Sequence, residues 1–76
     1  MTPEALHDLQ TALPLDWWVR YDAKRRTTEF RYTRTPRTDY HAIEVLDALD
    51  PEMHAHLLRE AVHQCHAFSE REETAR

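Results

Sequence analysis

The feature that most constrains the fold of this chain is the alternation of side chains within residues 17–34, WWVRYDAKRRTTEFRYTR. Residues 17–22 and 27–32 can form two antiparallel strands joined by a loop of four residues. One side of this hairpin then carries aromatic and β-branched side chains, paired as Trp17 with Tyr32, Val19 with Phe30 and Tyr21 with Thr28. A shift of one residue would move this set to the other side, so the pattern predicts a single register.

The other side of the predicted hairpin is polar apart from Trp18. Its cross-strand pairs are Trp18 with Arg31, Arg20 with Glu29, and Asp22 with Thr27. They offer a cation–π contact, an opposite-charge pair and a polar pair. The adjacent tryptophans therefore have different roles. Trp17 belongs to the core, whereas Trp18 is either covered by Arg31 or another part of the chain, or it anchors a partner.

The chain contains no glycine, which limits the turn between these strands. A two-residue hairpin turn needs conformations that glycine favours, so the sequence predicts a longer loop built on a type I turn. This loop holds the basic cluster Lys24, Arg25 and Arg26. Seven lysine or arginine residues and two acids lie within residues 20–37, although the whole chain has a net charge of −4. We therefore expect a basic hairpin between acidic ends.

Helix signals lie on both sides of the hairpin. Residues 3–13 carry leucines at helical spacing between Thr2, which can cap a helix, and Pro14, which ends it. Residues 51–70 follow a second capping residue, Asp50, and predict a longer helix. Its broad apolar stripe consists of Met53, Leu57, Leu58, Ala61, Val62, Cys65 and Phe68. This stripe is wider than a short hairpin covers, which motivates the hypothesis of a homodimer through the last helix.

Residues 38–49, TDYHAIEVLDAL, are compatible with two structures. Their alanine, leucine and glutamate content favours a helix, whereas residues 40–45 could instead form a third strand. We favour the helix, which gives a small α+β domain of order α-β-β-α-α with the antiparallel hairpin packed on helices. The alternative order is α-β-β-β-α. We expect a single domain over residues 1–70 and a frayed charged tail over residues 71–76.

The length and composition of the chain set the broad class of protein. Its 76 residues suit one small domain with a narrow margin of stability. Cys65 is the only cysteine, so the chain forms no internal disulfide. No apolar run reaches the roughly 18 residues that span a membrane, and the first residues lack a secretory pattern. We expect a soluble cytoplasmic protein with no membrane partner, and the arginine-, histidine- and alanine-rich composition suggests a bacterial or phage source.

The sequence offers no catalytic or cofactor motif. Without glycine it cannot contain a phosphate-binding loop, a dinucleotide fingerprint or a Gly-x-Ser-x-Gly motif. Cys65 falls on the apolar stripe, where a thiol is inert. His56, Glu60 and His63 share one helical face at a spacing that suits metal ligands, but such sites need further ligands from a second element. We expect no enzyme activity, no cofactor and no metal, with these three residues as the only candidate ligands.

These observations favour a small non-catalytic protein-binding module, acting as a regulator, adaptor or inhibitor of a larger protein or assembly. Phage- and plasmid-encoded inhibitors have this size and character. The alternative is a nucleic-acid-binding protein, because arginines contact phosphates and a two-stranded ribbon can enter the major groove. Both hypotheses use the polar side and the tip of the hairpin. The candidate partner-binding residues are Trp18, Arg20, Lys24, Arg25, Arg26, Arg31 and Arg34.

Overall fold

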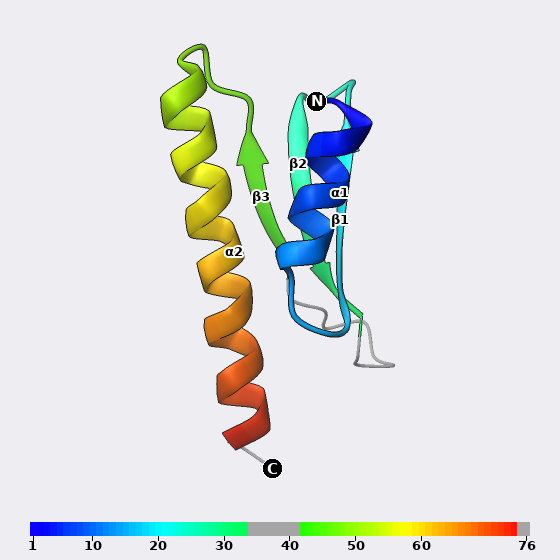
Figure 1. The fold of residues 1–76 in the computed structure, drawn as a ribbon, viewed down its shortest axis with the longest axis vertical. Helices are drawn as coiled ribbons and strands as arrows, with labels where there is room; N and C mark the ends of the chain where they lie inside the picture. The colour runs from blue at the N-terminus through cyan, green and yellow to red at the C-terminus, as the bar shows by residue number, and fades with distance from the viewer. Residues whose placement is uncertain (34–41, 75–76) are drawn as a thin grey trace.

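The computed structural model describes residues 1–33 and 42–74, which contain two helices and one three-stranded antiparallel sheet in the order α-β-β-β-α (Figure 1). The strands lie side by side in the order β1-β2-β3. The elements are α1 (Pro3–Ala12), β1 (Trp17–Asp22), β2 (Thr27–Tyr32), β3 (Ala42–Leu46) and α2 (Pro51–Thr74). This architecture confirms the predicted small α+β class.

The hairpin of β1 and β2 has the register that the sequence predicts. All six expected pairs are present, from Trp17 with Tyr32 at the open end to Asp22 with Thr27 beside the turn. The agreement follows from the two-residue period of a strand, because only this register gathers the aromatic and β-branched set on one side and leaves Trp18 with the polar side chains on the other.

The turn forms without glycine because Asp22 and Arg26 shape it. The Oδ1 atom of Asp22 accepts hydrogen bonds from the backbone N–H groups of Lys24 and Arg25, at 3.1 and 3.3 Å. Arg26 adopts the left-handed conformation that a glycine would favour, with φ at 51°. This conformation costs a side-chain-bearing residue roughly 1–2 kcal/mol, which the hydrogen bonds of Asp22 help to offset.

The predicted helix over residues 38–49 is wrong from residue 42 onward, where the chain forms β3 and then a link to α2. β3 confirms the alternative prediction of a third strand at residues 40–45, although the first two positions of that range lie outside the described residues. Ile43 and Val45 explain the outcome, because a strand places both on the helix-facing side of the sheet beside the core residues of β2. This packing overrides the helix propensity of alanine, leucine and glutamate, which takes no account of β2.

Both helices begin where the sequence predicts. Thr2 and Asp50 each accept a hydrogen bond from a backbone N–H of the first turn, at 3.1 and 3.0 Å. α1 ends at Ala12, one residue before the predicted end, and α2 continues to Thr74. Residues 71–74 of the expected tail therefore belong to α2, and the last two residues of the chain lie outside the described part.

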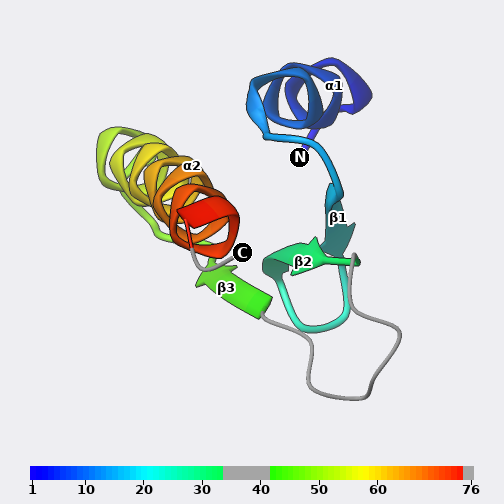
Figure 2. The same ribbon diagram turned by 90° about the horizontal axis from the view of Figure 1, so that it is seen from below.

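Figure 2 shows both helices on one side of the curved sheet, with α2 over β3 and α1 beside β1. Trp17 is the largest side chain of the core and is 2% exposed. Its ring centroid lies 5.4 Å from that of Tyr32 and 5.8 Å from that of Phe68, and its Nε1 donates a hydrogen bond to Ser69 Oγ at 2.9 Å. The buried apolar residues are Trp17, Phe30, Tyr32, Val45, Ala61 and Cys65. The predicted core role of Trp17 is confirmed.

Candidate functional site

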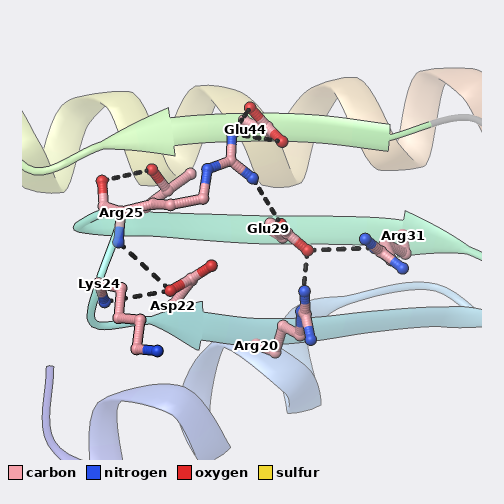
Figure 3. Close-up of polar contacts among 8 residues, drawn as sticks. Arg20, Asp22, Lys24, Arg25, Glu29, Arg31 and Glu44 are labelled. Atoms are coloured by element: carbon pink, nitrogen blue, oxygen red, sulfur yellow. Dashed lines mark hydrogen bonds and ion pairs between the residues drawn. The ribbon is translucent and has the colours of Figure 1, made fainter.

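The side of the sheet that faces away from the helices carries a buried carboxylate, that of Glu29 in the middle of β2. Glu29 is 2% exposed. Its Oε2 accepts hydrogen bonds from Nε of Arg20 at 2.8 Å and from Nε of Arg31 at 3.1 Å (Figure 3). Its Oε1 accepts a third, from Arg25 at 3.3 Å. Three arginine side chains thus cover the carboxylate. We call the surface formed by the following residues the outer face: Trp18, Arg20, Arg25, Glu29, Arg31 and Glu44.

Arg25 connects the turn of the hairpin to the third strand. One terminal nitrogen contacts Glu29, and the other donates to the two carboxylate oxygens of Glu44 at 3.1 and 3.3 Å. The Arg25 side chain therefore lies back over the sheet (Figure 3). Ion pairs with half-exposed partners contribute little to stability, so the main effect of these contacts is to fix where the guanidinium lies.

The arginines keep Glu29 charged although it is buried. The hydrogen bond from Arg20 lowers the pKa of the Glu29 carboxyl below its ordinary value, and this effect outweighs burial, which acts in the opposite direction. The same hydrogen bond raises the pKa of the Arg20 guanidinium. Both groups are therefore ionised at neutral pH, and the outer face presents fixed charges.

The contact with Glu29 orders Arg20 without using all the donors of its guanidinium. Arg20 bonds Glu29 through Nε, and a guanidinium carries five N–H donors in a planar fork. The terminal nitrogens of Arg20, whose side chain is 61% exposed, can therefore contact a carboxylate of another molecule while Nε stays bound. A side chain that is already ordered loses less rotamer entropy on binding.

Trp18 is the large apolar residue of the outer face, and it is 62% exposed. The prediction that it lies opposite Trp17 is confirmed, since strand alternation turns the two rings to different sides of the sheet. Trp18 and the exposed Leu15 both line a shallow pocket of about 390 Å³ at the start of β1. Arg31 is its cross-strand neighbour. The described residues leave most of the Trp18 ring accessible to a partner.

The structure brings together some of the predicted partner-binding residues and not others. Trp18, Arg20, Arg25 and Arg31 lie on the outer face, around Glu29 and Glu44. Lys24 and Arg26 are exposed at the turn, away from Glu29. The predicted residue Arg34 lies outside the described residues.

The sequence did not reveal the burial of Glu29 or the place of Glu44 on the outer face. The pairing of Arg20 with Glu29 was predicted, but the convergence of three arginines on Glu29 depends on how Arg25 folds back from the turn. Glu44 was missed because its segment was expected to be helical. Recognition of β3 would have placed Glu44 beside Glu29, since the two are cross-strand partners.

The chemical groups considered from the sequence are the candidate metal ligands of α2 and the thiol of Cys65. Within residues 1–33 and 42–74, no group of three or more histidine, cysteine or acidic side chains is placed to hold a metal ion. His56, Glu60 and His63 are exposed on α2. Cys65 is fully buried, and burial raises the pKa of its thiol to about 12, so the thiol is protonated and unreactive at neutral pH.

Comparisons of this chain with models of protein families, with curated proteins and with solved structures found no match. Neither described helix combines the length and the apolar composition that crossing a bilayer requires.

Proposed function

We propose that this protein is a small non-catalytic binding protein whose outer face recognises an acidic surface of a larger protein, as a regulator, adaptor or inhibitor would. One observation carries the proposal: the exposed Trp18 shares a face with three arginines that a single buried carboxylate, Glu29, holds in place. Tryptophan and arginine are the residue types that most often dominate binding energy at protein interfaces.

The charge of the outer face and the turn supports an acidic partner. Arg20, Arg31 and the three basic residues of the turn outnumber the acids among them, Asp22, Glu29 and Glu44. The rest of the chain is acidic, since the net charge is −4. A basic face on an acidic protein orients the encounter with an acidic partner and raises the association rate. The same charge disfavours contact between the outer faces of two copies.

The pattern of charges favours a protein over a nucleic acid. A nucleic acid presents a continuous row of phosphates, and binding proteins usually meet it with a strongly basic surface. The carboxylates of Glu29 and Glu44 lie among the arginines, and Arg25 already contacts both of them. Arg20 lies on β1, two strands away from Glu44 on β3, so an individual carboxylate of a partner can contact Arg20 without approaching Glu44. The nucleic-acid hypothesis from the sequence is therefore the less favoured one.

Quantitative capture of partners from a bacterial lysate, read by mass spectrometry, tests the proposal. We expect Trp18→Ala and Arg20→Ala each to weaken capture by about 30-fold, the effect of losing an interface hot spot of about 2 kcal/mol. Arg71→Ala is the matched control, because Arg71 is exposed on α2 away from the outer face. Circular dichroism checks that the variants stay folded. Equal capture by all these proteins would contradict the proposal.

A mobility-shift titration with duplex and single-stranded DNA and RNA separates the two functions. At about 50 mM salt we expect no complex at micromolar protein. A complex whose affinity falls steeply with salt, and which is lost in Arg25→Ala, would make nucleic acid the partner.

The homodimer through α2 stays a separate prediction. Met53 and Leu57 of the predicted stripe are exposed on α2, at 51% and 38%. Size-exclusion chromatography with light scattering measures the mass in solution, and a monomer mass at micromolar concentration would count against the homodimer.

A further inference from the structure

The two edges of the sheet are closed to different degrees. Beyond the β1–β2 ladder, the backbone N–H of Thr33 donates to the carbonyl of Asp16 at 2.8 Å. Hydrogen-bonded and non-hydrogen-bonded pairs alternate in antiparallel strands, so the backbone groups of Trp17 and Val19 point outward from the sheet. The amide of Gln10 on α1 occupies them: Nε2 donates to the Trp17 carbonyl at 2.8 Å, and Oε1 accepts from the Val19 N–H at 3.0 Å. α1 thereby closes part of the β1 edge.

Among the described residues, nothing closes the edge of β3 in this way. The backbone N–H of Asp47 donates to the carbonyl of Arg26 at 2.9 Å, so by the same alternation the backbone groups of Ala42, Glu44 and Leu46 point away from β2. Within residues 1–33 and 42–74, no hydrogen bond reaches these outward groups. Figure 2 shows α2 over one face of β3 and no described element along its outer edge.

Exposed apolar side chains surround this open edge. Leu46 of β3 is 67% exposed on the side of the sheet that carries Glu44. On α2, Leu58 and Val62 face α1 across a groove of about 560 Å³. Helix geometry places Met53 and Leu57 on the flank of α2 opposite to this groove, and α2 lies over β3 (Figure 2). These two residues are 51% and 38% exposed. The edge therefore lies between apolar side chains of the sheet and of the helix.

The acidic charge near the β3 edge disfavours pairing of this edge with the β3 edge of a second copy of the chain. Residues 42–60 carry five acids against Arg59, and Glu44 lies at the centre of β3. Antiparallel pairing of two β3 strands about their centres would put Glu44 against its own counterpart, and like charges directly opposite one another are destabilising. An extended segment that carries basic residues would instead be attracted by these acidic side chains.

We propose that the outer edge of β3 is a docking site for an extended segment of a partner protein, which adds to the sheet as a fourth strand. Its backbone bonds the outward N–H and carbonyl groups of Ala42, Glu44 and Leu46. Alternate aliphatic side chains contact Met53 and Leu57, and lysine or arginine residues lie near the acids. Addition of a strand to an open sheet edge is a recurring mode of peptide recognition. This site is separate from Trp18 and goes beyond the function proposed above.

Selection from a random library of displayed nonapeptides against the whole chain tests this docking site. We expect the recovered peptides to alternate aliphatic and basic residues. In the NMR spectrum of the ¹⁵N-labelled protein, a synthetic copy of a recovered peptide should shift the backbone N–H signals of Glu44 and Leu46 and protect them from hydrogen exchange. Methylation of alternate backbone nitrogens of the peptide removes its donors and should weaken binding at least about tenfold, the scale of a few lost hydrogen bonds.

The controls separate this site from the outer face. Trp18→Ala should leave peptide binding unchanged, whereas Leu57→Lys should weaken it by loss of apolar contact and by repulsion of a basic peptide. The proposal is overturned by a selection that recovers no peptide, or by peptides that map elsewhere on the protein. It is also overturned if sedimentation shows a dimer of the chain alone and hydrogen exchange shows that this dimer protects the backbone N–H groups of Glu44 and Leu46.

Discussion

The two sides of the β1–β2 hairpin are built from adjacent residues, yet different forces hold them. On the helix-facing side, Trp17 lies against Tyr32 and Phe68 and is buried by α2. On the outer face, Glu29 is equally buried, but its partners are three arginines whose own side chains remain 42% to 61% exposed. Burial therefore has two origins in this protein. Apolar contact stabilises the fold, while the ion pairs mainly set the positions of charged groups for binding.

The largest effect should come from Trp17→Ala on the helix-facing side. Loss of a fully buried aromatic side chain costs about 3–5 kcal/mol, and the core of a chain this short rarely supplies more than about 3–5 kcal/mol of total stability. We expect a largely unfolded chain in far-UV circular dichroism. The matched Trp18→Ala variant should change the free energy of unfolding by no more than about 0.5 kcal/mol. Similar losses in the two variants would remove the distinction between the sides.

Glu29→Gln should destabilise less, because its three arginine partners can rehydrate when the carboxylate is lost. We expect a decrease of about 1–3 kcal/mol in the free energy of unfolding, measured by urea denaturation at neutral pH. Glu44→Gln is the control, since Glu44 is 48% exposed and should cost less than about 1 kcal/mol. A smaller loss for Glu29→Gln than for Glu44→Gln would mean that burial adds nothing to the network.

The lowered pKa of Glu29 should make the outer face sensitive to acid. The folded state binds this proton less readily than the unfolded chain, whose carboxyl titrates near pH 4.5. The stabilisation by ionised Glu29 is therefore complete above that pH and is lost as the pH falls through the lower pKa of the folded state. Urea midpoints measured between about pH 7 and about pH 3 should fall more for the wild type than for Glu29→Gln. Parallel pH profiles would show that Glu29 does not drive the loss.

Gln10→Ala should destabilise much less than Trp17→Ala, and it tests how α1 closes the β1 edge of the sheet. The variant loses two hydrogen bonds to β1, which contribute about 1 kcal/mol each at most in a partly exposed site. Hydrogen exchange of the Val19 backbone N–H should accelerate, while that of Phe30 in the middle strand should change less. Unchanged exchange at Val19 would mean that α1 does not close this edge.

Much of the fold could be predicted because several local signals agree. The hairpin register follows from side chains on both of its sides, and the helix starts follow from Thr2 and Asp50. β3 could not be predicted with the same certainty, because its short sequence favours a helix in isolation and a strand only when β2 lies beside it. The burial of Glu29 could not be predicted from the local sequence either, because it depends on a turn conformation that brings Arg25 back over the sheet.

The most direct test of the difference between the two sides is iodide quenching of tryptophan fluorescence in the wild type and in Trp18→Phe. Iodide stays in water, so it quenches Trp18 at 62% exposure and not Trp17 at 2%. We expect the wild type to show one quenchable and one protected fraction of emission, and Trp18→Phe to lose the quenchable fraction while its urea midpoint stays the same. Strong quenching that persists in Trp18→Phe would place Trp17 in solvent and contradict the account.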